Sequence, residues 1–216
     1  MARARSLAGL TLRALADATG HQLPPDTTRA KGWVGQVVED ALGAAAGSRA
    51  VPDFEALGIE LKTVPIDARG RPRESTYVTT LPLAELRADQ LEQSSLRKKL
   101  ARVLFIPVEA SPELPLSVRR VGSPLLWTPS PEDFEQLDAD WTAFAELVEA
   151  GRVEDIGPEL GEVLQVRPKG ANAAERTWAP GPDGVPIRTM RRGLYLRPRF
   201  VHALFLRSFH MPAPSA

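Results

Sequence analysis

The sequence predicts a mixed α/β fold, and three observations support that prediction. Short stretches in which apolar and polar residues alternate recur along the chain, as in strands. Between and around them lie stretches with apolar residues every three or four positions, as in amphipathic helices. A length of 216 residues with 43% hydrophobic residues allows a real core, in one large domain or in two lobes.

The N-terminal part is predicted to be helical. Residues 1–20 suit a short amphipathic helix better than a signal peptide, because Arg13 and Asp17 interrupt the apolar stretch. Residues 21–28 are a linker, and residues 31–48 carry apolar side chains on one helical face. No apolar run approaches the roughly 18 residues needed to span a bilayer. We therefore expect a cytoplasmic protein without a membrane partner.

Strands are expected in the middle of the chain. Residues 59–64 alternate with period two, and residues 76–83 and 102–109 look like further strands. The stretch 102–109 is apolar enough to be the central strand of a sheet. An arginine-rich turn covers residues 68–75, and residues 123–130 form another strand that ends in proline.

The last third of the chain alternates helix, strand and loop. Residues 131–151 are strongly amphipathic, and Gly151 ends this helix. Residues 162–170 form a short strand, residues 178–186 a Gly/Pro loop, and residues 193–209 a strand that leads into a last helix. The apolar stripe of the long helix is core packing, and its members are Phe134, Leu137, Trp141, Phe144 and Val148.

Composition excludes several kinds of site. The chain has no cysteine, which excludes disulfides, zinc ribbons and thiol catalysis. Its three histidines have no metal-ligand spacing, so a zinc site is not expected.

Charge is distributed unevenly although the formal net charge is zero. Between Glu132 and Glu159 nearly every charge is acidic, whereas basic residues dominate from Val163 onward. This asymmetry fits an electrostatic footprint for a polyanion, and on charge alone a solvated basic face is an equal alternative. The basic residues are Arg167, Lys169, Arg176, Arg188, Arg191, Arg192, Arg197, Arg199 and Arg207.

Acidic residues and a lysine converge around the first strand. Period-two geometry puts Glu60 and Lys62 on one strand face, and Asp53 approaches from the preceding segment. Carboxylates are ligands suited to Mg²⁺, which activates water and neutralises charge on a phosphodiester, and a lysine can orient the attacking water. The alternative is an edge strand with a local Glu–Lys pair, because a loose D…ExK pattern is common by chance.

Glu39 lies off the apolar stripe of its helix, one turn from Gly35 and from Gly43. A carboxylate between two positions without side chains can be approached closely by a ligand or by another backbone segment. An exposed helix glutamate is the commoner alternative.

PDFEALGIELK (Pro52–Lys62) matches the PD…(D/E)xK signature of the restriction-endonuclease-like nucleases, and its surroundings resemble the MutH family. That family comprises the nicking endonucleases of methyl-directed DNA mismatch repair. The resemblance runs in order from about Thr11 to Phe200. Its blocks are KGWVGQVVEDALGAAAGS, DFEALGIELKTVPID, GRPRESTYV, KKLARVLFIPVE, RRVGSPLLWTPS, LQVRPKGANA and GLYLRPRF.

The resemblance implies roles for individual residues. Asp53 and Glu60 are the implied Mg²⁺ ligands, with the Leu61 carbonyl as a further ligand and Mn²⁺ as a substitute metal. Lys62 is similar to the catalytic lysine, and further active-site residues are implied at Glu39 and Lys99.

The resemblance also implies DNA contacts. Arg167 and Lys169, with Pro168 between them, match a base-contacting segment, and Tyr195 matches a tyrosine that senses adenine methylation. Lys31 and Gly32 resemble a DNA-contacting corner. Two positions depart from the family pattern: Tyr77 stands where a phenylalanine is familiar, and the loop 171–187 differs.

The implied architecture is a restriction-endonuclease-like mixed sheet flanked by helices, in a single domain with two lobes that clamp DNA. The catalytic lobe covers about residues 1–110, and the DNA-contacting lobe covers about residues 111–216. The implied protein is a monomer that MutL activates after MutS has found a mismatch. The acidic helix 132–149 is a candidate MutL surface, and a solvated face is the alternative.

The sequence thus predicts a Mg²⁺-dependent endonuclease that nicks the unmethylated strand at hemimethylated GATC sites. A GATC-specific type II restriction endonuclease is the nearest alternative, although such enzymes usually carry extra chain or dimerise. A noncatalytic DNA-binding module is disfavoured because Asp53, Glu60 and Lys62 are all present. A chance α/β protein with a charged edge strand is a remote alternative.

Overall fold

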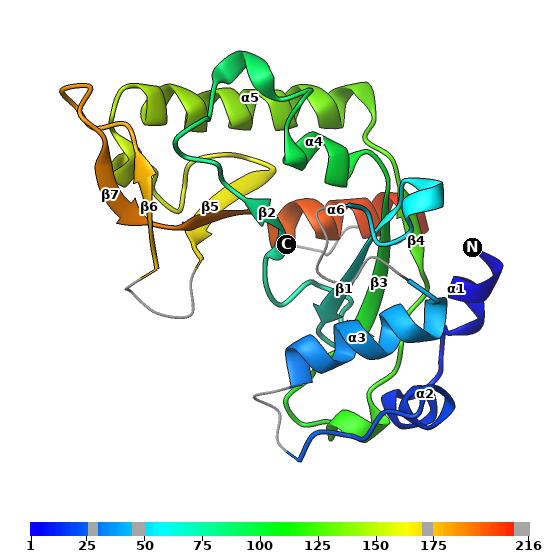
Figure 1. Cartoon of the computed structure of the whole chain (residues 1–216). Helices are drawn as coiled ribbons and strands as arrows, with labels where there is room; N and C mark the ends of the chain where they lie inside the picture. The colour runs from blue at the N-terminus through cyan, green and yellow to red at the C-terminus, as the bar shows by residue number, and fades with distance from the viewer. Residues whose placement is uncertain (26–29, 45–50, 170–174, 210–216) are drawn as a thin grey trace. The chain divides into compact units, whose positions relative to one another are not determined.

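A computed structural model of the chain describes residues 1–25, 30–44, 51–169 and 175–209. It is mixed α/β, as the sequence predicts, with several helices and small sheets (Figure 1). The chain divides into two compact units. Unit 1 comprises residues 1–74, 101–128 and 201–216, and unit 2 comprises residues 75–100 and 129–200. The predicted lobe boundary near residue 110 remains a prediction. Within the described residues, no helix is long and apolar enough to cross a membrane.

The sheet of unit 1 is built around a buried central strand. Its order is β1-β3-β4, with β1 parallel and β4 antiparallel to β3. All residues of β3 except the last are buried, so the prediction of a central strand at residues 102–109 is confirmed. The strands are β1 (Glu60–Ile66), β3 (Val103–Glu109) and β4 (Leu125–Trp127).

The helices of unit 1 differ from the predicted ones in their lengths. The single helix expected in residues 1–20 is two helices, because the chain turns at Gly9 with φ of +85°. The helix expected to reach residue 48 stops at Leu42, where Gly43 has φ of +77°. These helices are α1 (Ala2–Ser6), α2 (Leu12–Thr19) and α3 (Ala30–Leu42), with short 3-10 helices at Glu55–Leu57 and Leu116–Val118.

Unit 2 contains an antiparallel sheet in the order β2-β8-β5 and a separate two-stranded hairpin, β6–β7. The hairpin was not expected, because the sequence indicated only a loop at residues 178–186. A loop does join its strands, but regular pairing extends on both sides of it. The strands are β2 (Thr76–Thr80), β5 (Leu164–Pro168), β6 (Arg176–Ala179), β7 (Ile187–Met190) and β8 (Arg192–Leu196).

The long helix predicted at residues 131–151 is confirmed as α5 (Pro131–Glu149). Ser130 and Asp133 form a capping box at its start, and Gly151 with φ of +72° follows its end. Trp141 is buried and donates its indole N–H to the Arg87 carbonyl at 2.9 Å. The expected core stripe is largely buried, with Phe134 half-buried. Unit 2 also holds α4 (Ser95–Leu100) and 3-10 helices at Ala88–Gln90 and Val153–Asp155.

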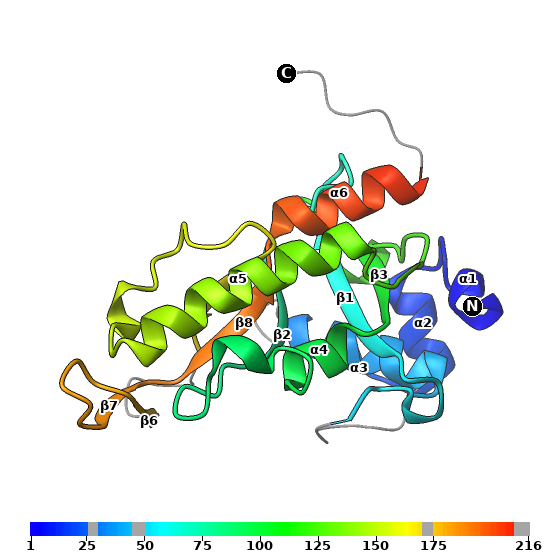
Figure 2. The ribbon, with the colours of Figure 1, turned by 90° about the horizontal axis from the view of Figure 1, so that it is seen from above.

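The last helix, α6 (Pro198–Phe209), contains the boundary between the two units. Figure 2 shows this helix following directly on β8. Its unit 1 portion places Phe205 against Phe105 of β3, with ring centroids 6.3 Å apart in an edge-to-face arrangement. The last helix therefore contributes to the core of unit 1.

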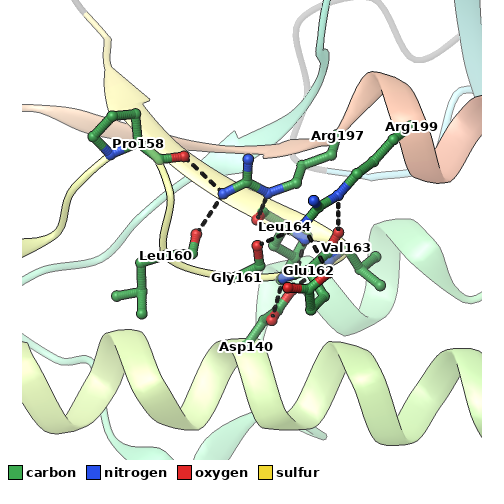
Figure 3. Close-up of polar contacts among 9 residues, drawn as sticks. All are labelled: Asp140, Pro158, Leu160, Gly161, Glu162, Val163, Leu164, Arg197 and Arg199. Atoms are coloured by element: carbon green, nitrogen blue, oxygen red, sulfur yellow. Dashed lines mark hydrogen bonds and ion pairs between the residues drawn. The ribbon is translucent and has the colours of Figure 1, made fainter.

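A polar network fixes the entry to β5 in unit 2 (Figure 3). Asp140 of α5 is buried and accepts hydrogen bonds from the backbone N–H groups of residues 162–164, at 2.7–2.8 Å. Arg197 is also buried and donates to the carbonyls of Pro158, Leu160 and Leu164. Because both charged groups have several partners, they lock the segment that begins β5 rather than contacting a ligand.

Candidate active site

A tight turn brings Asp53 beside the first residues of β1. Phe54 and Ile59 pair across this turn, and Gly58 adopts φ of +60° within it. The Asp53 carboxylate then accepts a hydrogen bond from the Leu61 N–H at 2.7 Å. The structure therefore joins the two parts of the motif, eight positions apart, by a direct contact.

Glu60 and Lys62 lie on the same face of β1, as their spacing predicts. The Lys62 ammonium contacts Glu60 Oε1 at 2.6 Å. The Glu60 side chain is only 2% exposed and that of Lys62 is 16% exposed, so this ion pair is largely shielded from water. The alternative from the sequence, an edge strand with a local Glu–Lys pair, agrees with the position of β1 at the edge of its sheet, but the pair is buried rather than solvated.

Glu39 of α3 belongs to the same group of charges. Its pKa is raised, first because the carboxyl is partly buried and then because Asp53 lies near it; Lys62 opposes the rise, and Asp40 and Glu60 add to it. Position 35 brings α3 close to β1, because a Cβ at Gly35 would lie 3.9 Å from both Glu39 Oε1 and Thr63 Oγ1. We call Glu39, Asp53, Glu60 and Lys62 the carboxylate cluster.

The donors of the carboxylate cluster fit a hard divalent cation. Carboxylate and carbonyl oxygens are the ligands that Mg²⁺ takes, with water and phosphate oxygens completing its shell. The pKa of Glu39 is raised, first by burial and then by the nearby Asp53, and Lys62 offsets this rise only in part. In the described part of the chain, no three acidic or histidine side chains already form a metal-binding group.

Lys99, the other lysine implied at the active site, lies in the last turn of α4 in unit 2. The carboxylate cluster lies in unit 1. The role of Lys99 at that cluster therefore remains a prediction.

A second group of predicted residues meets on the sheet of unit 2. Tyr77 of β2 and Tyr195 of β8 are directly paired, with ring centroids 5.3 Å apart in an edge-to-face contact. The Lys169 ammonium lies 3.7 Å from the centre of the Tyr77 ring, and the Arg167 guanidinium lies 5.8 Å from that of Tyr195. Residues from three separate stretches of sequence thus form one surface.

Gly193 is a member of this surface that the sequence analysis missed. A Cβ at position 193 would lie 3.0 Å from Tyr195 Cε2, 3.1 Å from Tyr77 Cε2 and 3.4 Å from Lys169 Cβ. A side chain there would require both tyrosine rings to shift by a few tenths of an ångström. A glycine inside a predicted strand, directly before Leu194, was the sequence signal that another residue comes close to this position. We call Tyr77, Arg167, Lys169, Gly193 and Tyr195 the tyrosine cluster.

Hydrogen bonding and burial position the polar groups of the tyrosine cluster. Arg167 is exposed and donates to Ser75 Oγ at 2.9 Å, which directs its guanidinium. Burial, and to a smaller extent Tyr77, raises the pKa of Tyr195, while Arg167 lowers it, so the phenol keeps its proton at neutral pH. Tyr195 is half-buried, and Pro168 next to Arg167 is exposed.

The basic footprint inferred from the sequence needs correction. Arg192 is buried and pairs with Glu154 at 2.6 Å, and Arg197 is buried against backbone carbonyls. Neither presents its charge to solvent, whereas Arg167 and Arg188 are exposed. Lys31 and Gly32 lie in the first turn of α3; Gly32 is exposed, and the side chain of Lys31 is outside the described part. Of the loop 171–187, which departs from the family pattern, the structure describes residues 175–187, and residues 171–174 lie outside the described part.

Known proteins resemble this chain over nearly its whole length. The family model of the DNA mismatch repair enzyme MutH matches residues 42–140. The DNA mismatch repair protein MutH of Vibrio cholerae serotype O1 is 49% identical over 209 residues, which cover 97% of this chain and 95% of the relative. The protein of the same name from Salmonella paratyphi B is 49% identical over 214 residues, covering 99% and 93%.

Proposed function

The chain belongs to the MutH family of DNA mismatch repair enzymes, and on that premise we propose that it is a Mg²⁺-dependent endonuclease. In this proposal it nicks the unmethylated strand at hemimethylated GATC sites. The observation that carries the proposal is the contact of Asp53 with the Leu61 N–H beside the shielded Glu60–Lys62 pair. This arrangement offers two carboxylates and an ammonium at one end of a single strand.

Each residue of the carboxylate cluster has a distinct part in the proposed reaction. Asp53, Glu60 and the Leu61 carbonyl would hold Mg²⁺, with Mn²⁺ as a substitute, and this cation would supply a lowered pKa of bound water and charge neutralisation on the phosphate. Lys62, already 2.6 Å from Glu60, orients the attacking water or stabilises charge on the phosphate oxygens. Glu39 adds negative charge that strengthens cation binding, and Lys99 is included as an active-site lysine.

The tyrosine cluster is proposed to contact the bases. Arg167 and Lys169 follow each other at alternate positions from β5, so both extend toward one groove of the duplex. Tyr195 presents a protonated hydroxyl and a ring edge to an adenine, and Tyr77 supports its ring. Lys31, Gly32 and Pro168 complete the proposed DNA contacts.

The proposal also includes the properties that the resemblance implies for the whole protein. These are a restriction-endonuclease-like fold with a DNA clamp of two lobes, a monomeric state and a cytoplasmic location. Activation by MutL, in response to MutS, belongs to the proposal as well. The acidic residues of α5 are one candidate surface for MutL.

The test uses three plasmids that differ only in the methylation of their GATC sites. The protein is incubated with Mg²⁺ and each plasmid, with EDTA as the metal-free control, and nicks are mapped to single nucleotides. We expect nicks in unmethylated strands at GATC, little cleavage of fully methylated plasmid, and stimulation by MutL. Prompt cutting of both strands of unmodified GATC would favour a type II restriction endonuclease. Tight binding without any cleavage would favour a noncatalytic module.

A further inference from the structure

The hairpin β6–β7 of unit 2 carries an exposed strip outside the tyrosine cluster. Trp178 and Arg188 are directly paired across it, as are Arg176 and Met190. All four side chains are exposed, including 52% of Trp178 and 36% of Met190. Thr189, between Arg188 and Met190, is buried, and Thr177, between Arg176 and Trp178, is half-buried, so the hairpin has one inner and one outer face. We call the four outer residues the hairpin strip.

The chemistry of the hairpin strip is that of a surface for a polyanion. The Arg188 guanidinium lies over the Trp178 ring, 5.2 Å from its centre, and Arg176 donates to the Arg188 carbonyl at 3.3 Å. Arginines bind phosphate bidentately, and a guanidinium also stacks on the face of an aromatic ring. The nearest acids are outside the strip: Glu175 pairs with Arg191 at 3.6 Å, and Asp183 lies in the loop. Glu154, which is near enough to interact with the charge of Arg176, is hydrogen-bonded to Thr189 and Arg192.

Glu154 contacts the inner face of the hairpin and the first residue of β8. Its carboxylate accepts hydrogen bonds from both Thr189 of β7 and Arg192 of β8. Residues 189 and 192 would point to opposite sides in a regular strand, so the alternation shifts between them. The outer residues Arg188 and Met190 therefore lie on the same side as Gly193 and Tyr195, away from Glu154. Figure 2 shows β7 and β8 following one another as a nearly continuous ribbon.

We propose that the hairpin strip is a second contact surface for duplex DNA, binding the sugar-phosphate backbone beside the sequence that the tyrosine cluster contacts. This inference rests on the proposed DNA substrate. Gly193 follows Arg188 by five positions, a span of at most about 16 Å in extended chain. That distance equals about five base pairs at 3.4 Å per step. With the hairpin running along the duplex axis, the strip binds DNA up to about five base pairs to one side of the GATC site.

A protein partner fits this surface less well. A stable protein interface covers about 800 Å² on each partner, and four residues of one hairpin supply only part of that. Two exposed arginines on one face, one of them over an indole ring, also match phosphates better than an apolar anchor.

The test measures binding to duplexes that differ in the length of DNA beside the site. One duplex has GATC with three flanking base pairs on each side, and the other has ten. Wild-type protein, Arg188→Ala, Trp178→Ala and the control Arg152→Ala are compared without divalent metal between 50 and 200 mM salt. Arg152 is an exposed arginine of the same unit that pairs with Asp155 and is not part of the strip, so it matches the lost charge.

We expect the variants to differ only on the long duplex. Arg188→Ala should lower the slope of log K against log salt by about 0.9, a change of about 3.5-fold in relative affinity between the two salt concentrations. Trp178→Ala should weaken binding several-fold without changing the slope, because indole carries no charge. Both variants should bind the short duplex like wild type, and Arg152→Ala should match wild type on both.

Two outcomes would overturn the inference. Equal weakening on short and long duplexes would place the strip at the GATC site itself, and unchanged binding on both would leave the strip for a protein partner. Binding is measured without divalent metal, so the flank effect remains measurable even if nicking fails.

Discussion

The carboxylate cluster of unit 1 and the tyrosine cluster of unit 2 present opposite charge in different surroundings. In the first, three acids share a partly buried space with one lysine, and burial and neighbouring acids raise the pKa of Glu39. In the second, the cations Arg167 and Lys169 lie over the rings of Tyr195 and Tyr77 at an accessible surface. The first cluster therefore needs a cation to become neutral, whereas the second needs an anion.

This difference suits the carboxylate cluster to the cleavage reaction and the tyrosine cluster to the selection of the DNA sequence. A site with excess buried negative charge repels DNA unless a metal is present, so it adds little affinity by itself. An exposed cationic surface attracts the duplex, and its rings and hydrogen bonds discriminate among bases. Changes in one cluster should alter the rate of cleavage, and changes in the other should alter which DNA is cleaved.

The largest expected effect follows from Glu60→Ala in the carboxylate cluster. It removes the shielded partner of Lys62 and one implied metal ligand, so nicking should fall by about a thousandfold or more. DNA binding without metal should stay close to wild type or become tighter, because repulsion of the backbone is reduced. Plasmid nicking and fluorescence anisotropy measure the two quantities on one preparation. The same result is expected for Asp53→Ala and Lys62→Ala, and normal nicking by folded Glu60→Ala protein would contradict the assignment.

Arg167→Ala should alter selectivity in the tyrosine cluster. A bidentate arginine–guanine contact contributes about 1–3 kcal/mol of discrimination, so the preference for GATC over single-base variants should fall about 5- to 150-fold. Arg167→Lys keeps the charge but loses the planar fork, and it should lose most of the same preference. Competition binding with altered sites measures the effect. An equal loss on all sequences would reduce Arg167 to a phosphate contact.

Tyr195→Phe should produce a smaller change, in methylation discrimination. The hydroxyl can accept a hydrogen bond from the exocyclic amine of adenine, and methylation replaces the exposed hydrogen of that amine. Losing the hydroxyl should narrow the difference in nicking between unmethylated and fully methylated DNA several-fold, since one hydrogen bond contributes about 0.5–1.5 kcal/mol. Tyr195→Ala should narrow it further. A uniform loss on all substrates would assign Tyr195 to packing against Tyr77.

Glu39→Gln should give the smallest effect, and it concerns stability. Because the pKa of Glu39 is raised in the folded state, chiefly by burial, the folded protein binds this proton more tightly than the unfolded chain does. Stability from this group is therefore lost as pH rises from about 4.5 through the raised pKa. At pH 7 without metal, Glu39→Gln should raise Tm slightly, by up to about 3 °C. The gain should vanish at low pH, and Mg²⁺ should stabilise the wild type more than the variant. A lower Tm for Glu39→Gln than for the wild type at pH 7 would contradict the prediction that the charged Glu39 carboxylate is destabilising.

Local patterns in the sequence predicted the elements that local chemistry determines. The capping box and stripe of α5, the apolar β3 and the shared face of Glu60 and Lys62 all follow from spacing along one element. The MutH family was also identifiable from the order of its blocks.

Long-range contacts explain what the sequence did not predict. Arg192 and Arg197 were predicted to belong to the basic footprint, but both side chains are buried. Arg192 pairs with Glu154, and Arg197 donates hydrogen bonds to three backbone carbonyls. The hairpin β6–β7 was hidden by its Gly/Pro-rich loop, and Gly193 matters only because Tyr77 and Lys169 come close to it from other strands. No window of adjacent residues contains such information.

The packing of Phe205 against Phe105 has a consequence for synthesis of the chain. About a hundred residues separate the two rings, and translation at 5–20 residues per second takes about 5–20 s to cover that distance. During this interval the central strand β3 lacks one of its covering aromatic side chains. Unit 1 therefore reaches its final core only after unit 2 has been translated, and the nascent apolar strand is a natural target for a chaperone.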